Sequence, residues 1–83
     1  MEDEEIQKGL LKVLEKQFDI PKDKISLDAD FRNDLKMDSL DHYDYLNAVE
    51  EEFHLDIPEE DERLIGIRNA RDLFLYLKEN YKL

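Results

Sequence analysis

The chain has 83 residues, enough for one domain (residues 1–83) with a modest core, and no cysteine, which excludes disulfides and thiolate metal sites. Its 23 acids and 12 bases give a net charge of −11, which repels nucleic acid and anionic membranes and attracts basic protein surfaces. No apolar run approaches the roughly 20 residues of a membrane span, and the acidic start MEDEEIQKGLLKVL is unlike a secretory signal. We therefore expect a soluble, cytoplasmic protein.

The first predicted element is an amphipathic helix over about residues 3–18. Apolar residues recur there at helical spacing: Ile6, Leu10, Val13, Leu14 and Phe18. Pro21 disfavours helical geometry in Ile20, so the pair should end the helix. Residues 19–38 have no sustained period and are predicted to form a long structured loop. Its apolar anchors should be Ile25, Leu27, Phe31 and Leu35.

A second helix is expected from Ser39 to about Phe53, with Asp38 or Ser39 as its cap. At 100° per residue, one side of this helix carries mostly apolar residues: His42, Tyr45, Leu46, Val49 and Phe53. The opposite side is half apolar and half acidic, and consists of Leu40, Tyr43, Asp44, Asn47 and Glu51. That composition suits docking to a partner better than burial.

After a turn at Pro58, a short helical piece is expected near residues 59–65 and a last helix from Asn69. The pair Asn69 and Asp72 resembles a capping box. The apolar stripe of the last helix should be Ala70, Leu73, Phe74, Leu77 and Tyr81. With no strand-like alternation, the fold class is all-α: a small three-to-four-helix bundle with a long loop between its first two helices.

The negative charge is concentrated in one segment. Between Lys36 and Arg63 there is no Lys or Arg, and Met37 to Glu62 holds eleven acids, while the other twelve acids balance the twelve bases. The segment begins next to Asp38 and Ser39. A solvated face kept acidic for solubility would explain it, as would a docking surface for basic partners.

Ser39 and His42 are three residues apart, which raises the possibility of a serine hydrolase. Against it, the helical wheel turns His42 toward the core, no Gly-rich turn supplies oxyanion donors, and the neighbouring acids oppose a developing oxyanion. Residues 28–39 also resemble a calcium loop, but Arg32, Asn33 and Ser39 occupy its fifth, sixth and twelfth positions, so the match fails. We predict neither catalysis nor a dedicated metal site.

A third possibility is that Ser39 carries a covalent group. A serine at a helix start is exposed, and a phosphodiester there would meet the first-turn N–H groups. Such a serine needs no activating base of its own, because a second protein can bring one.

The stretch DLKMDSLDHYDYLNAVEEEFHLDIPEE resembles the phosphopantetheine attachment region of acyl carrier proteins, whose hallmark is Asp-Ser-Leu at the start of the second helix. Asp38, Ser39 and Leu40 stand at those positions. The acidic Glu50-Glu51-Glu52-Phe53, the downstream Ile57-Pro58 and the order of elements extend the resemblance over essentially the whole chain.

The resemblance implies a non-catalytic carrier. Ser39 would receive 4′-phosphopantetheine from coenzyme A through a phosphopantetheinyl transferase and Mg²⁺, and the arm would hold acyl chains as thioesters for fatty-acid or related specialised acyl or polyketide synthesis. Basic-patched enzymes such as ketoacyl synthases and reductases would dock on the second helix of the monomer. The docking residues would be Asp38, Leu40, Asp41, Tyr43, Asp44, Asn47, Glu50 and Glu51.

The chain departs from the family pattern in five features. Lys36 stands where the family usually has Gly, Tyr43 replaces a smaller aliphatic residue, and Asn47 replaces a large apolar one. Tyr45 replaces an inward-facing aliphatic residue, and the stretch EEDERLIGI is longer than the family's usual segment. Two alternatives therefore remain: an unmodified acidic helical interaction module, and a peptidyl or aminoacyl carrier. The eleven-acid segment favours acyl cargo.

Overall fold

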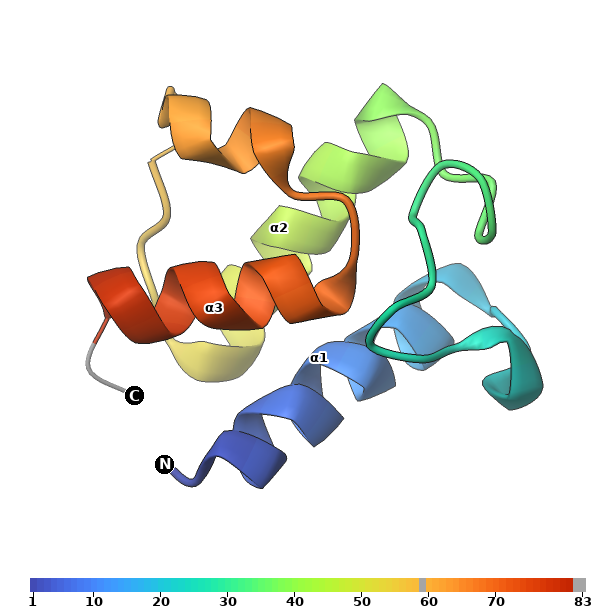
Figure 1. Ribbon diagram of the computed structural model, residues 1–83, viewed down its shortest axis with the longest axis horizontal. Coiled ribbons are helices and arrows are strands. Elements are labelled where there is room, and N and C mark those ends of the chain that lie inside the picture. The colour runs from blue at the N-terminus through green and yellow to red at the C-terminus, as the bar shows by residue number, and fades with distance from the viewer. Residues whose placement is uncertain (59, 82–83) are drawn as a thin grey trace.

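The computed structural model describes residues 1–58 and 60–81. Its α-helices are α1 (Asp3–Phe18), α2 (Ser39–Phe53) and α3 (Ala70–Asn80), and short 3₁₀ turns form η1 (Lys22–Lys24) and η2 (Glu62–Gly66) (Figure 1). The described residues contain no strand, which confirms the all-α prediction. No described helix combines the length and apolarity needed to cross a membrane.

The predicted range of α1 is confirmed, but proline is not what ends the helix. Asp19 adopts the left-handed conformation (φ 53°) directly after Phe18, two residues before Pro21. Pro21 instead precedes η1, a turn that the sequence pattern did not predict. The short helical piece expected near residues 59–65 is η2, which begins at Glu62; Glu59 lies outside the described residues.

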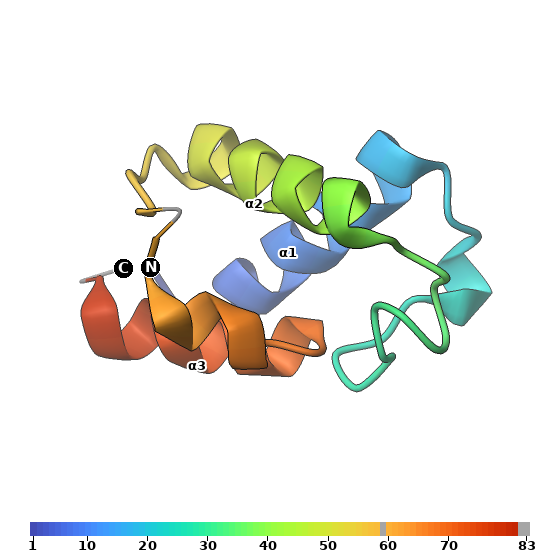
Figure 2. The same cartoon turned by 90° about the horizontal axis from the view of Figure 1, so that it is seen from above.

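The core is built on α1, which packs against both α2 and α3 (Figure 2). Tyr45 of α2 is fully buried at its centre: its hydroxyl donates to the Leu10 carbonyl (3.0 Å), and Phe31 packs edge-on against its ring (5.3 Å between centroids). Gly9 allows close approach of the helices, because a Cβ there would lie 2.6 Å from Phe53 Cζ. The inward face predicted for α2 is confirmed, with Phe53 partly buried.

The long loop is fixed by contacts with the segment that leads into α3. The Phe31 N–H donates to the Arg68 carbonyl (2.8 Å), and the Arg71 N–H donates to the Leu27 carbonyl (3.0 Å). Phe31 and Met37 are buried, so the loop contributes to the core. Of the predicted anchors, Phe31 is buried and Ile25 and Leu35 pack partly against the core, whereas Leu27 is only partly buried and acts through its backbone.

The turn η2 is attached to α3 by a polar cluster. Asp61 accepts hydrogen bonds from the Arg63 guanidinium (2.7 and 2.9 Å) and the Tyr76 hydroxyl (2.9 Å), and Arg63 also donates to Asn80. These donors, above all Arg63, hold the pKa of the Asp61 carboxyl well below its usual range. At the start of α3, Asn69 caps the Asp72 N–H, but Asp72 accepts from Arg68 N–H, so only half of the predicted box forms.

Candidate functional site at the start of α2

The N-terminus of α2 is closed by a complete capping box. Asp38 Oδ1 accepts from the Asp41 N–H (2.8 Å), and Asp41 Oδ2 accepts from the Asp38 N–H (3.2 Å). Asp38, and not Ser39, is therefore the cap, and Ser39 is the first helical residue. Ser39 is exposed, so its hydroxyl is presented at the end of a rigid helix.

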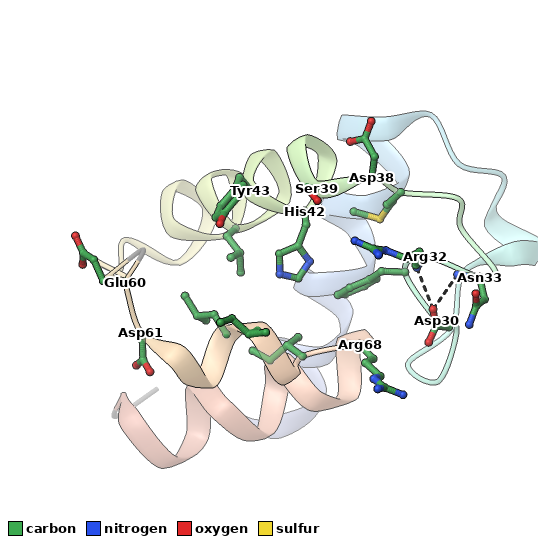
Figure 3. A pocket seen from close by; sticks show the side chains of 16 residues that line it. Asp30, Arg32, Asn33, Asp38, Ser39, His42, Tyr43, Glu60, Asp61 and Arg68 are labelled. Atoms are coloured by element: carbon green, nitrogen blue, oxygen red, sulfur yellow. Dashed lines mark hydrogen bonds between the residues drawn. The ribbon is translucent and has the colours of Figure 1, made fainter.

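Ser39 lies at a pocket of about 740 Å³ between the first half of α2, the end of the long loop and η2 (Figure 3). That volume falls within the range of small-molecule sites, about 300–1,000 Å³. Apolar side chains from all three segments form much of its wall: Phe31, Met37, Leu46, Leu64, Ile65 and Ile67. The pocket can therefore accept an apolar group that is tethered next to it.

His42 projects from α2 into this pocket toward η2 (Figure 3). The imidazole is half-buried and packs edge-on against Phe31 (5.9 Å between centroids). Burial lowers the pKa of His42 below its usual value, the neighbouring backbone of Leu64 partly opposes this, and the charge of Arg32 adds to it. The imidazole is therefore neutral at neutral pH. His42 and Ser39 line the same pocket, but no hydrogen bond joins their side chains in the described residues, so the structure gives a Ser39–His42 hydrolase no support.

The loop that resembles a calcium site uses the carboxylate at its third position, Asp30, for its own turn. Asp30 Oδ1 accepts from the N–H groups of Arg32 (3.0 Å) and Asn33 (2.8 Å). Among the residues that the structure describes, no group of three or more His, Cys, Asp or Glu side chains could hold a metal ion.

The outer face of α2 is open, as the helical wheel predicts. Leu40 is 73% and Tyr43 51% exposed, and Asp38, Asp44, Asn47 and Glu51 are also exposed. Asp41 and Glu50 are partly buried and have structural contacts: Asp41 completes the capping box, and Glu50 Oε2 accepts from the Ile57 N–H (3.3 Å). Acidic and apolar side chains thus alternate on one accessible surface.

Comparison with known proteins identifies the family. A family model described as "Phosphopantetheine attachment site" matches residues 8–77. An acyl carrier protein of Treponema denticola is 33% identical over 79 residues, which covers 95% of this chain and 99% of that protein. An acyl carrier protein of Cyanidium caldarium is 36% identical over 73 residues, 87% of this chain and 85% of that protein.

The chain belongs to the acyl carrier protein family. Family membership implies a covalently attached 4′-phosphopantetheine, and the residues at the start of α2 fit such a group. The N–H groups of Ser39 and Leu40 lie in the first turn, where a helix has no internal acceptors for them, so they can face a phosphodiester. The pocket beside Ser39 would have space for the remainder of an arm attached there.

The sequence pattern missed most of the residues that line the pocket. Arg32, Leu64, Ile67 and Arg68 were not candidates, and Ile65, 83% exposed on η2, was not expected to share the rim with Tyr43. These residues come from segments that are far apart in the sequence. The one signal in the sequence is that apolar residues recur around residues 31–37 without a helical period.

Lys36 has a left-handed backbone (φ 58°), a conformation that costs a residue with a Cβ roughly 1–2 kcal/mol. We expect Lys36→Gly to raise the free energy of unfolding by about 0.5–1 kcal/mol, since the relief of strain exceeds the extra entropy of glycine in the unfolded chain. Urea denaturation measures the change. The control Lys24→Gly, at a position without positive φ, should destabilise instead; equal effects would contradict strain at Lys36.

Proposed function

We propose that Ser39 is the attachment residue of 4′-phosphopantetheine and that this chain is a non-catalytic, monomeric, cytoplasmic acyl carrier. It would deliver acyl intermediates to enzymes of fatty-acid synthesis or of a related specialised acyl or polyketide pathway. The observation that carries the proposal is the position of Ser39: exposed, first in a capped helix, within Asp38-Ser39-Leu40, and at the rim of a pocket.

The chain's own residues would hold the group in three ways. Ser39 Oγ provides the ester linkage, the first-turn N–H groups of α2 face the phosphate, and the apolar pocket walls accept the acyl portion. The arm would supply a thiol that forms thioesters, chemistry that a chain without cysteine cannot otherwise perform.

Partner enzymes would dock on the outer face of α2. Exposed Leu40 and Tyr43 would make the apolar contacts next to Ser39, and the surrounding acids would attract a basic rim on the partner. Such docking is electrostatically steered and short-lived, which suits a carrier that visits a transferase and then several acyl-processing enzymes.

Charge reversal tests this docking face. We expect Asp44→Lys/Glu51→Lys to lower kcat/KM for loading by a phosphopantetheinyl transferase about tenfold at low salt, because steering is lost, and we expect the difference to shrink as NaCl rises. The control Asp23→Lys/Glu79→Lys makes the same charge change at exposed positions outside α2. An equal loss in both double variants would show that net charge, and not this face, guides the partner.

Loading tests the attachment itself. Wild-type protein incubated with coenzyme A, Mg²⁺ and a broad-specificity transferase should gain the mass of one phosphopantetheinyl group. Persistent failure with several transferases would overturn the proposal. Such a failure would favour the alternative of an unmodified acidic interaction module. The departures from the family pattern at Lys36 and Asn47 support that alternative. The intact mass and cargo of the protein from its own cell would separate that module from an acyl carrier and from a peptidyl or aminoacyl carrier.

A further inference from the structure

We propose that the pocket beside Ser39 selects a short acyl group that ends in a carboxylate, and that Arg32 and His42 bind this carboxylate. The inference rests on the proposed attachment at Ser39 and adds the chemical class of the cargo. It starts from Arg32 and His42, two of the polar residues that line the pocket together with its apolar side chains.

Arg32 and His42 approach the same part of the pocket from two segments. His42 comes from α2 and is half-buried against Phe31, whereas Arg32 comes from the loop next to Phe31 and its guanidinium extends toward the imidazole (Figure 3). The two side chains are close enough for the charge of Arg32 to disfavour protonation of His42. The two side chains thus present a guanidinium that is always positively charged and an imidazole that is neutral.

Arg32 forms no ion pair within the described part of the chain. The four ion pairs found there use Lys8, Arg63, Arg71 and Lys78. The acids nearest in sequence are engaged elsewhere: Asp30 accepts from the backbone of its own turn, and Asp34 accepts from the Asp30 N–H (2.7 Å). At the other end of the pocket, Asp61 is paired with Arg63. A cargo carboxylate would therefore meet a free guanidinium at the Arg32 end.

The deeper interior leaves little room for a long hydrocarbon. Tyr45 is fully buried, and Phe31 and Phe18 pack edge-on against its ring, so a long chain would have to displace aromatic core side chains. A saturated chain confined to the pocket would offer no hydrogen-bond acceptor to Arg32 or His42. A carboxylate would offer Arg32 a charge-assisted bond, while the apolar side chains of the pocket accept the methylene groups between the carboxylate and the thioester.

Three cargoes of equal length separate these possibilities. Stable amide-linked analogues of adipoyl-, ω-hydroxyhexanoyl- and hexanoyl-coenzyme A would be the donors. A transferase with Mg²⁺ would move the acylated phosphopantetheine of each donor to the protein and release adenosine 3′,5′-bisphosphate, with intact mass confirming each loading. We expect the adipoyl form to melt about 5 °C above the hexanoyl form, with the hydroxyl form near the hexanoyl value. Without specific binding, one more negative charge on a chain of net charge −11 would lower the melting temperature, so the sign of the shift is decisive.

Arg32→Gln should remove the advantage of the adipoyl form, whereas Lys22→Gln, the same charge change at an exposed residue outside the pocket, should keep it. The fold should survive, because the Arg32 side chain is exposed. The hydrogen bond from Arg32 to Asp30 Oδ1 (3.0 Å) uses the backbone N–H, which the substitution keeps. Nuclear magnetic resonance should show a higher pKa for His42 in the adipoyl form than in the hexanoyl form. An adipoyl form that melts no higher than the hexanoyl form, or an advantage that persists in Arg32→Gln, would overturn the inference. Failure to load any analogue would instead count against attachment at Ser39.

Discussion

Ser39→Ala is expected to abolish the addition of phosphopantetheine completely, because alanine has no oxygen to form the phosphodiester. The melting temperature should change by less than about 4 °C, since Ser39 is exposed and the capping box uses only Asp38 and Asp41. Intact-mass spectrometry after incubation with coenzyme A, Mg²⁺ and a transferase measures the first effect, and thermal denaturation measures the second.

The chain provides a matched control. Ser26 is the only other serine, and it is also exposed, in the loop that follows η1. Ser26→Ala should load as fully as the wild type. A mass gain on Ser39→Ala, or its loss on Ser26→Ala, would show that the modification is attached at a different residue.

Tyr45→Ala should give the largest loss of stability, a decrease of about 3–5 kcal/mol in the free energy of unfolding, because it leaves a cavity where α1, α2 and the long loop meet. Tyr45→Phe keeps the ring and removes the hydrogen bond to the Leu10 carbonyl, so it should cost about 1 kcal/mol. Urea denaturation followed by circular dichroism measures both changes.

Tyr43→Ala is the control for this pair, two residues away on the exposed side of the same helix. It should change the free energy of unfolding by no more than about 0.5 kcal/mol. If Tyr43→Ala and Tyr45→Ala destabilised the protein equally, the orientation of α2 described above would be wrong.

The helices could be predicted from the sequence because each has an apolar stripe that only a helical period explains. Asp3–Phe18 and Ser39–Phe53 match the expected ranges, and Asn69 caps the last helix as expected. Helix ends were harder to explain, because a single left-handed residue such as Asp19 can end a helix and no periodicity reports it. Tyr76 lies outside the predicted stripe of α3 but is buried, and its hydroxyl donates to Asp61 of another segment, a contact that no local pattern predicts.

The candidate site was only partly predictable for a related reason. The outer face of α2 follows from 100° per residue, so Leu40, Tyr43 and Asp44 were placed correctly on the exposed side. The pocket needs the packing of residues 30–39, 42–46 and 60–68 against one another, which no local pattern specifies. His42 was expected at the boundary of the core, but its role as part of the pocket wall emerged only with η2 opposite it.

The cluster of Asp61, Arg63, Tyr76 and Asn80 joins η2 to α3, and the Phe31 and Arg71 amides join the long loop to the same part of the molecule. The turn η2, helix α3 and the long loop are therefore linked to one another by hydrogen bonds. Helix α2 forms the facing side of the pocket. We expect a bulky cargo to be accommodated by a small tilt of α2 against these linked segments, with every one of these bonds intact. Partner enzymes would bind α2 itself. A change in its tilt would therefore make the loaded and the unloaded protein present different surfaces to them.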